Sequence, residues 1–288
     1  MSTSHSDRQT VPVSVIMLHY CRPSLIMRSI ESLLMQTVWP KELIILDDFS
    51  PYDDYWLMKL RVKRRLPYQI HTVICRNTYN QGCGRASKTA IEMSSQPYIA
   101  YLDSDDLWTP TKLEKQYLSY VDGSGYLEKG LCFTGIQHES TQLFGSRRWE
   151  KAFEDAYLGK IPFTPRSSLM IRRNTLALAG GHSPMRQADD YATALRVMAI
   201  SRTYCIDEPM LIVPKNDERD KVSLTAPLNA VNRIFWGMRA RREASVLVGR
   251  LGLRLPCSPE LKALKDLKNL AIDMSYRGYK RCQEKLSR

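Results

Sequence analysis

The feature that most constrains the fold is a series of four short apolar segments, separated by stretches in which apolar residues recur at helical spacing. The apolar segments cover residues 13–20, 42–46, 68–75 and 98–102. Nearly continuous apolar runs of this length are typical of strands that are buried on both faces of a parallel sheet. The alternation therefore predicts an α/β fold with a Rossmann-like, mostly parallel sheet flanked by helices.

Helical spacing in the first half of the chain predicts helices at residues 25–34, 52–66, 84–95 and 110–120. The second half is less regular. Its apolar patterns predict strands at residues 131–137, 167–171, 204–206 and 210–213. They also predict a short helix that stops at Gly180-Gly181 and an amphipathic helix at residues 189–200. We expect residues 1–10, which are polar, to be disordered.

Most of the excess positive charge lies near the C-terminal end. The 288 residues include 42 Lys and Arg against 30 Asp and Glu, and residues 228–288 hold 14 of the former and 5 of the latter, a net +9 of the total +12. Helical patterns at about residues 228–248 and 259–286 predict a basic helical tail. Three interpretations of this tail stay open: packing on the body of the protein, attachment to an anionic membrane surface, and binding of nucleic acid, which is the least favoured.

Composition excludes several classes of protein. With 43% hydrophobic and 25% charged residues, the chain is neither wholly disordered nor fibrous. It has no apolar run of the roughly 18 residues that span a bilayer, and no basic N-terminal segment followed by an apolar one, so we expect a cytoplasmic protein, with peripheral attachment to the inner face of the membrane as one option. The seven cysteines are scattered without a C-x-x-C pair, which argues against a disulfide framework and a zinc site.

Polar residues follow three of the predicted strands, at residues 19–22, 47–50 and 103–106. Ligands of doubly wound sheets bind beyond the carboxyl ends of the strands, so these residues are expected at one rim. The sequence YLDSDDLW at residues 101–108 places several carboxylates there, and such oxygen ligands suit Mg²⁺ or Mn²⁺ bound to a phosphate. The competing interpretation is the N-cap and acidic first turn of the next helix.

Other motifs also allow a functional and a structural interpretation. Asp47-Asp48 could bind a ribose or base, or close an Asx turn. Residues 80–85, with Lys88, could bind a phosphate before a helix, or form a plain glycine turn. Asp189-Asp190 suits a helix N-terminus without any function. We interpret His19 as a rim residue bonded to the backbone, and leave His182 open between a site residue and an exposed turn residue.

Together these stretches resemble the family 2 glycosyltransferases of the GT-A fold. The resemblance covers roughly residues 11–225 and rests on six stretches in the right order. They are VSVIMLHYCRP with a helix ending in MQT, ELIILDDFS, NQGCGR, YIAYLDSDDLWTPTKLEKQ, SSLMIRRNTLALAGG and ADDYATALRVMA. The resemblance implies a GT-A sheet domain that uses a nucleotide-diphospho-sugar.

The resemblance also implies roles for individual residues. Asp190 corresponds to the catalytic base, with Asp189 beside it. The donor nucleotide would contact Leu18, His19, Tyr20, Asp48, Arg85, Lys88, Asp103 and Ser104. A Mn²⁺ or Mg²⁺ cofactor would be held by Asp103, Asp105 and Asn216, with Asp217 as the alternative to Asn216. Gly180, Gly181 and His182 would lie on the acceptor side.

The resulting prediction divides the chain at residue 227. Residues 11–227 form the glycosyltransferase domain, with a nucleotide-sugar half at 11–122 and an acceptor half at 123–227, and residues 228–288 form the basic tail. The predicted function is a metal-dependent, inverting hexosyltransferase that moves a sugar, with a UDP-sugar favoured, to a hydroxyl of a glycan or lipid-linked envelope saccharide. The alternatives are a non-catalytic nucleotide- or nucleic-acid-binding protein and a nucleotidyltransferase on a similar sheet.

Overall fold

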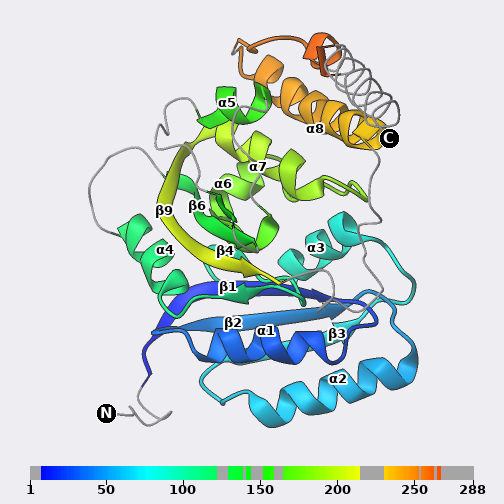
Figure 1. Cartoon of the computed structure of the whole chain (residues 1–288), viewed down its shortest axis with the longest axis vertical. Helices are drawn as coiled ribbons and strands as arrows, with labels where there is room; N and C mark the ends of the chain where they lie inside the picture. The colour runs from blue at the N-terminus through cyan, green and yellow to red at the C-terminus, as the bar shows by residue number, and fades with distance from the viewer. Residues whose placement is uncertain are drawn as a thin grey trace, which may run out of the picture.

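A computed structural model describes residues 8–121, 129–138, 141–143, 152–158, 165–214, 230–252, 254–262 and 265–266. The first half contains β1 (Thr10–His19), α1 (Leu25–Leu34), β2 (Trp39–Asp47), α2 (Tyr52–Arg65), β3 (His71–Arg76), α3 (Cys83–Glu92), β4 (Tyr98–Tyr101), β5 (Leu107–Trp108) and α4 (Lys112–Val121). The second half contains β6 (Lys129–His138), β7 (Thr141–Leu143), α5 (Ala152–Leu158), a 3₁₀ turn (Arg166–Ser168), β8 (Met170–Arg172), α6 (Arg173–Leu178), α7 (Asp189–Ile200), β9 (Arg202–Val213) and α8 (Ala230–Arg250) (Figure 1).

The strands form one mixed, mostly parallel sheet in the order β3-β2-β1-β4-β8-β6-β9-β5, with β7 paired to β6. Strands β1 to β4 are mutually parallel, as predicted, while β8 runs antiparallel to both β4 and β6. After β1 the chain moves through β2 to β3 on one side, and it returns through α3 to β4 on the other side of β1. This reversal places a topological switch point between β1 and β4, where ligands bind in doubly wound sheets.

Two predictions for the strands of the second half were wrong for local reasons, and one short strand of the first half was missed. The strand expected at residues 167–171 begins only at β8, because the backbone N–H and hydroxyl of Ser168 both donate to Pro165 O and close a 3₁₀ turn (2.9 and 2.8 Å). The strands expected at residues 204–206 and 210–213 are one strand, β9, whose register against β6 shifts beside Pro209. A shift of this kind accommodates a proline inside a strand. The two-residue strand β5, which pairs with β9, was not predicted.

The disorder expected at the N-terminus is also wrong for residues 8–10. Thr10 begins β1, and the side chain of Arg8 donates to the carbonyl oxygens of Leu34 and Gln36 (2.5 and 2.9 Å). The Gln9 carbonyl accepts the backbone N–H of Trp39 (2.9 Å). Residues 1–7 lie outside the described residues.

Both faces of the sheet are covered by helices, which explains the continuous apolar pattern of β1. Val13, Val15 and Met17 face a cluster that includes side chains of α1, α2 and α4, whereas Ile16 and Leu18 face a second cluster with α3, α6 and α7. In Figure 1, α1 and α2 accordingly lie on one side of the sheet and α3 and α7 on the other. Alternate residues of one strand thus enter two different cores.

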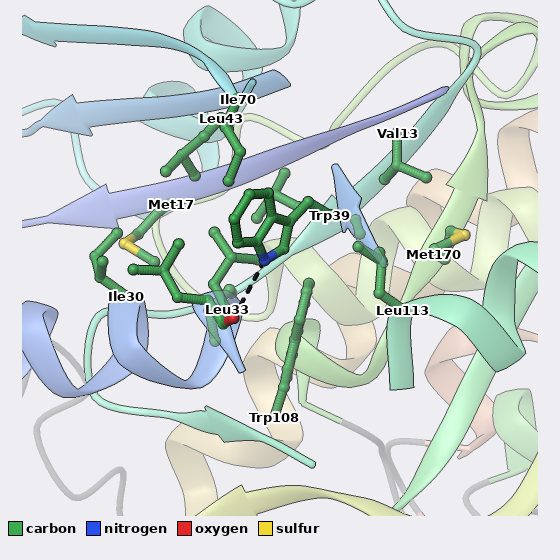
Figure 2. Close-up of a cluster of buried hydrophobic side chains, with 14 of the residues drawn as sticks. Val13, Met17, Ile30, Leu33, Trp39, Leu43, Ile70, Trp108, Leu113 and Met170 are labelled. Atoms are coloured by element: carbon green, nitrogen blue, oxygen red, sulfur yellow. Dashed lines mark hydrogen bonds between the residues drawn. The ribbon is translucent and has the colours of Figure 1, made fainter. Parts of the chain in front are cut away.

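The first core is built around Trp39, at the start of β2. Its side chain is 0% exposed, and the indole N–H donates to the carbonyl of Leu34 (3.1 Å) (Figure 2). Ile30 and Leu33 of α1 and the ring of Trp108 lie around it in the same cluster. Because its single polar atom is satisfied, this large side chain is buried without an unpaired donor.

The helix α8 packs on the body of the protein. Ala240, Ala244 and Val248, which recur at four-residue spacing, are buried against it, and α7 is the neighbouring helix. The packing interpretation thus describes α8, whereas the second helical pattern lies mostly outside the described residues and its packing stays a prediction. None of the helices in the described part of the chain has both the length and the apolar character needed to cross a membrane.

We expect Trp39→Ala to lower the free energy of unfolding by about 3–5 kcal/mol, because it leaves a large cavity in the first core. Urea unfolding measures this change. The control is Trp56→Ala, which removes a tryptophan that is 46% exposed on α2 and should change stability by about 0.5 kcal/mol or less. Equal losses in the two variants would contradict the packing described here.

Candidate active site

The rim where β1 and β2 end is held together by buried polar contacts. His19, which is 0% exposed, donates from Nδ1 to Asp47 Oδ2 (2.6 Å), and its Nε2 accepts the backbone N–H of Arg22 (3.2 Å). Since Nε2 accepts, the ring proton resides on Nδ1 and the imidazole is neutral. The interpretation of His19 as a rim residue bonded to the backbone is confirmed, and both ring nitrogens are used within the protein.

Asp47 also organises the loop that follows β2. Its carboxylate accepts the hydroxyl and the backbone N–H of Ser50 (2.5 and 2.9 Å), and Ser50 Oγ accepts the backbone N–H of Cys21 from the neighbouring loop (2.8 Å). The two loops are thereby joined. This is the Asx-type turn that the sequence allowed at Asp47.

Asp48, by contrast, accepts hydrogen bonds from the loop after β3. Its Oδ1 accepts the side-chain amide of Asn77 and the backbone N–H of Gln81 (2.8 and 2.9 Å), and its Oδ2 accepts the backbone N–H of Gly82 (2.8 Å). The residue is only 6% exposed. The predicted contact of Asp48 with a nucleoside stays a prediction, but most of its acceptor positions are already filled by this loop.

The glycines of this loop serve close packing. Gly82 has a φ of +78°, and a Cβ on Gly84 would lie 2.1 Å from the carbonyl oxygen of Met185. The first turn of α3 therefore contacts the backbone just before α7. Of the two predicted phosphate-binding cations on α3, Arg85 is exposed and Lys88 lies 3.9 Å from Glu92 on the solvent side of the helix.

Strained backbone conformations gather at the same rim. Among the described residues, three residues other than glycine have positive φ: Cys21 (52°), Phe49 (75°) and Ala188 (55°). They lie after β1, after β2 and immediately before α7. Such conformations cost of order 1–3 kcal/mol each and tend to occur at functional sites, so their grouping supports a site at this rim.

The acidic loop after β4 contains two ion pairs. Asp103 Oδ1 accepts from Nη2 and Nε of Arg166 (2.6 and 3.1 Å), and Asp105 Oδ2 accepts from Nη1 of Arg22 (2.7 Å). The side chains of Asp103 and Asp105 remain 28% and 14% exposed. The acids predicted as a metal and nucleotide site therefore reach the rim, and two arginines partly neutralise them.

The acidic loop offers one carboxylate oxygen of the kind that binds a divalent cation. The second carboxylate oxygen of Asp103 has no partner among the described residues, and carboxylate oxygens are the ligands that Mg²⁺ and Mn²⁺ prefer. No group of three or more His, Cys, Asp or Glu side chains suited to a metal occurs within the described ranges. Asn216 and Asp217, the predicted third ligand and its alternative, lie outside them.

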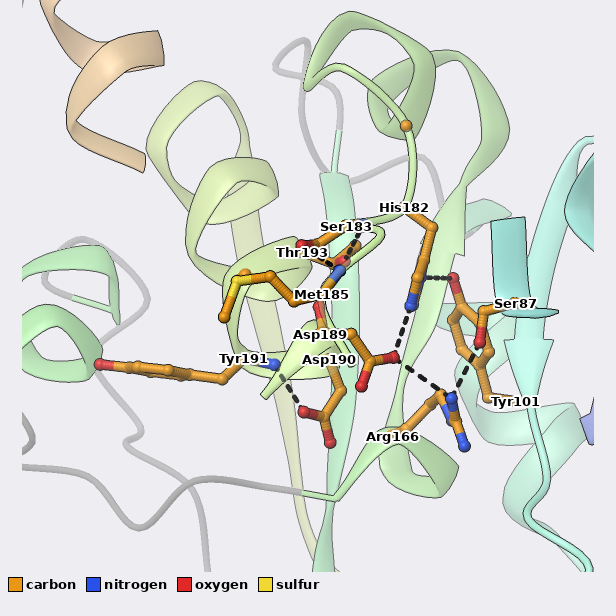
Figure 3. Close-up of polar contacts among 12 residues, drawn as sticks. Ser87, Tyr101, Arg166, His182, Ser183, Met185, Asp189, Asp190, Tyr191 and Thr193 are labelled. Carbon is orange, nitrogen blue, oxygen red and sulfur yellow. Dashed lines mark hydrogen bonds and ion pairs between the residues drawn. The ribbon is translucent and has the colours of Figure 1, made fainter. Parts of the chain in front are cut away.

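Arg166 connects this acidic loop to the start of α7, and Figure 3 shows its contacts with Asp189 and Ser87. Its Nη1 donates to Ser87 Oγ on α3 (2.8 Å) and lies 3.4 Å from Asp189 Oδ2, while its other nitrogens bind Asp103. The residue is 8% exposed. Burial acts to lower its pKa, but the charges of Asp103 and Asp189 outweigh this and raise the pKa well above the usual value.

His182 is buried in the same network, so the exposed-turn interpretation was wrong. It is 3% exposed, its Nε2 lies 2.9 Å from Asp189 Oδ2, and its Nδ1 lies 3.2 Å from the hydroxyl of Tyr101 at the end of β4. Burial holds the pKa of His182 below its ordinary value. The neutral ring then accepts from Tyr101 and donates to Asp189, which makes His182 a support for that carboxylate.

The two acids at the start of α7 differ in their environments. Burial alone would raise the pKa of Asp189, but the hydrogen bond from His182 and the charge of Arg166 prevail and lower it. Asp190 accepts only the backbone N–H of Tyr191 (2.8 Å) among its described contacts, and in Figure 3 its carboxyl group points away from His182. Burial and the neighbouring charge of Asp189 raise the pKa of Asp190 to about 7. A group that titrates near neutrality suits general acid–base chemistry.

The remaining predicted site residues lie in the core, at the rim or at the end of a helix. Leu18 belongs to the second core, Ser104 is buried and Tyr20 is partly exposed at the rim. Gly180 and Gly181, with φ of +88° and +76°, end α6, and the Gly181 N–H donates to Leu176 O (2.8 Å). Left-handed glycines are common at helix C-termini, and the proposed role of this turn toward an acceptor stays a prediction.

Sequence reasoning assigned no role to Arg22 and did not single out Arg166. Arg22 belonged to a segment already placed at a strand end, so its location was predicted but its partner was not. Arg166 lies 63 residues from Asp103 in the chain and 23 from Asp189. The only local signal for it was an arginine next to Pro165, directly before an apolar stretch.

Comparison with known proteins identifies the family. The profile described as Glycosyl transferase family 2 matches residues 14–178, more than half of the chain. The chain belongs to this family. The prediction from the six stretches is thereby confirmed.

This chain is 35% identical over 134 residues to WfaP of Escherichia coli, which is named as a UDP-Glc:alpha-D-GlcNAc-diphosphoundecaprenol beta-1,3-glucosyltransferase. The match covers 43% of this chain and spans half (50%) of WfaP. Residues 1–349 of S. aureus TarS, in complex with UDP-GlcNAc, superpose with a TM-score of 0.62 at 15% identity, and the match covers 87% of this chain and 69% of that fragment. The mannosyltransferase PcManGT from Pyrobaculum calidifontis, in complex with GDP-Man and Mn²⁺, gives a TM-score of 0.54 at 17% identity, covering 96% and 85%. These structures confirm the expected GT-A architecture.

We expect Arg166→Met to lower the free energy of unfolding by about 3 kcal/mol, because it leaves the buried carboxylate of Asp189 without its cation. The control is Arg65→Met, which removes an exposed ion pair with Glu31 and should cost less than about 1 kcal/mol. Chemical unfolding at neutral pH measures both. A loss in Arg166→Met no larger than in the control would show that the bridge contributes nothing to stability.

The protonation of Asp190 predicts a pH-dependent stability. Its pKa of about 7 in the folded protein lies above the value of about 4 for an unfolded Asp. Between these pH values the folded chain keeps a proton that the unfolded chain has lost, so this carboxyl lowers stability as pH rises. Asp190→Asn removes the effect, and its stability relative to the wild type should increase from about pH 5 to about pH 8. The exposed Asp53→Asn is the control, and parallel pH curves for the wild type and Asp190→Asn would refute the assignment.

Proposed function

We propose that this protein is a metal-dependent, inverting hexosyltransferase that transfers a sugar from a nucleotide-diphospho-sugar to a hydroxyl of a lipid-linked envelope saccharide or related glycan. The observation that carries the proposal is the pair Asp189-Asp190. The Asp189 carboxylate lies 3.4 Å from Arg166 Nη1 and 2.9 Å from His182 Nε2, whereas the adjacent Asp190 accepts only the backbone N–H of Tyr191 among the described contacts, and its pKa is raised by burial and by the charge of Asp189. Arg166 links this pair to the acidic loop at the switch point of the sheet.

In the proposed reaction, Asp190 accepts the proton of the acceptor hydroxyl. The hydroxyl oxygen forms a bond to the anomeric carbon from the face opposite to the diphosphate, and the bond to the diphosphate oxygen breaks with its electron pair. The configuration at that carbon is thereby inverted. Asp189 does not exchange the proton, because Arg166 and His182 keep it ionised, and its charge keeps Asp190 basic.

The leaving diphosphate needs positive charge near the acidic loop. A Mn²⁺ or Mg²⁺ ion, held by Asp103 and Asp105 with Asn216 as the proposed third ligand, would stabilise the charge that develops on the leaving oxygens. Arg22, which is paired with Asp105, lies at the same loop and would contribute a fixed cation, and Arg85 at the first turn of α3 is a second candidate. These residues come from both proposed halves of the domain.

The proposed substrates rest on the names of similar proteins. WfaP is named for a UDP-Glc donor and an acceptor linked to diphosphoundecaprenol, and TarS was solved with UDP-GlcNAc. These names favour a UDP-sugar and a lipid-linked saccharide. The Mn²⁺ bound to PcManGT together with GDP-Man supports the proposed cofactor.

The decisive assay incubates the full chain with UDP-Glc, UDP-GlcNAc and GDP-Man, a diphospholipid-linked GlcNAc acceptor, and either Mn²⁺ or EDTA. We expect release of the nucleoside diphosphate with Mn²⁺ and not with EDTA. Asp190→Asn should lower kcat by about 10²–10⁴-fold, as is typical for the loss of a general base, while Asp53→Asn should leave it unchanged. In the wild type, kcat/KM should rise with pH through about 7, because the base must be deprotonated.

Two results would refute the proposal. One is the absence of nucleoside diphosphate release with every donor. The other is full activity of Asp190→Asn together with a wild-type pH profile that is flat around pH 7. Release of pyrophosphate in place of the nucleoside diphosphate would identify a nucleotidyltransferase.

A further inference from the structure

The outer surface of α2 is unusually apolar for a helix that covers a sheet. The helix packs on the first core through Tyr55, Met58 and Val62, while four large apolar side chains remain on its solvent side. They are Tyr52 (62% exposed), Trp56 (46%), Leu57 (40%) and Leu60 (49%). Single exposed apolar residues are ordinary, but four on one helix form a patch.

The spacing of these residues makes the patch continuous. Tyr52, Trp56 and Leu60 recur every four residues, which places them on one line along the helix, and Leu57 lies beside them. The rings of Tyr52 and Trp56 are 5.8 Å apart and meet edge to face. Phe49, 43% exposed in the loop before α2, extends the row, with the guanidinium of Arg76 over its ring (4.6 Å).

Exposed positive charge flanks the C-terminal half of this row. Arg61, Lys63 and Arg64 are exposed on α2, and no carboxylate within the described ranges forms an ion pair with them. The acids of the helix, Asp53 and Asp54, are confined to its first turn. The C-terminal half of α2 therefore presents apolar and cationic side chains together. We call Tyr52, Trp56, Leu57, Leu60, Arg61, Lys63 and Arg64 the α2 face.

We propose that the α2 face binds the surface of an anionic phospholipid bilayer. An amphipathic helix that lies in the plane of the interface inserts its aromatic and leucine side chains at the headgroup boundary, and its basic residues contact lipid phosphates. Trp and Tyr, with an apolar ring and a polar atom, are suited to that boundary. The inference goes beyond the proposed function, since it needs neither donor nor acceptor.

Charge and composition disfavour the other occupants. A second copy of the chain would bring Arg61, Lys63 and Arg64 against cations of the same kind, and like charges disfavour such a contact. A nucleic acid would use the cations and could stack on rings, but it offers no partner for Leu57 and Leu60. A bilayer surface offers phosphates to the cations and an apolar boundary to both the rings and the leucines.

The chain itself offers a matched control surface on α8. Phe235 and Val246 are 46% and 56% exposed there, close to the values of Trp56 and Leu60. In Figure 1, α8 and α2 lie at opposite ends of the long axis of the molecule, so a flat bilayer that touches one helix does not touch the other. The membrane contact that the sequence allows for residues 228–288 would use the α8 end, and a single experiment separates the two surfaces.

The test is co-sedimentation of the full chain with phosphatidylcholine vesicles, with and without phosphatidylglycerol. We expect the wild type to bind the vesicles that contain phosphatidylglycerol and to dissociate at high salt. The double variant Trp56→Ser with Leu60→Ser, and the variant Arg61→Gln with Arg64→Gln, should each bind at least about tenfold more weakly. Phe235→Ser with Val246→Ser should bind like the wild type. Chemical unfolding checks that all variants fold, as expected for exposed positions.

Several results would overturn the assignment of the α2 face. They are no binding of the wild type to either vesicle, equal binding of the wild type and both α2 variants, or a loss confined to the α8 variant. Light scattering tests whether a second copy of the chain covers the α2 face. That would be shown if the wild type is a dimer and the double variant Trp56→Ser with Leu60→Ser is a monomer. None of these results bears on the transfer assay, so the two proposals can fail separately.

Discussion

The buried guanidinium of Arg166 is the interaction on which the rest of the site depends. It joins the acidic loop after β4, the first part of α3 and the start of α7 through Asp103, Ser87 and Asp189. Three backbone segments far apart in the sequence are thereby held at one rim. A planar group with five donors can do this, whereas a lysine ammonium, a point charge on a flexible stem, lacks the fixed fork geometry.

The ionisation of the two acids on α7 follows from this arrangement. Arg166 and His182 stabilise the charged form of Asp189, and that charge, with burial, disfavours the charged form of Asp190. Two adjacent residues of the same type thus acquire different pKa values. The left-handed Ala188 before them and the packing of Gly84 on Met185 O hold the start of α7 against α3, so the difference depends on backbone contacts as well as on charge.

The parallel half of the sheet was predictable because burial on both faces leaves a strong pattern. Strands β1, β2 and β4 appear as apolar runs, whereas the partly exposed edge strand β3 leaves a weaker pattern, and the acids that follow β2 and β4 reach the rim. The two-residue β5 was missed because it is too short for any periodicity, and β9 was divided because Pro209 mimics a strand end. Arg22 and Arg166 were given no role, because their partners lie 83 and 63 residues away in the chain.

The sequence by itself determined the class of fold, the succession of the first four strands along the chain and the rim at which the acids gather, because these follow from local apolar patterns and from the direction of parallel strands. Only the tertiary structure decided which acids are occupied in holding the frame, as Asp47 and Asp48 are, and which one, Asp190, has a raised pKa. It also decided that an apolar and basic surface remains open on α2 while α8 packs on the body. Ion pairing, burial and exposure depend on distances through space, and the linear order of residues does not specify them.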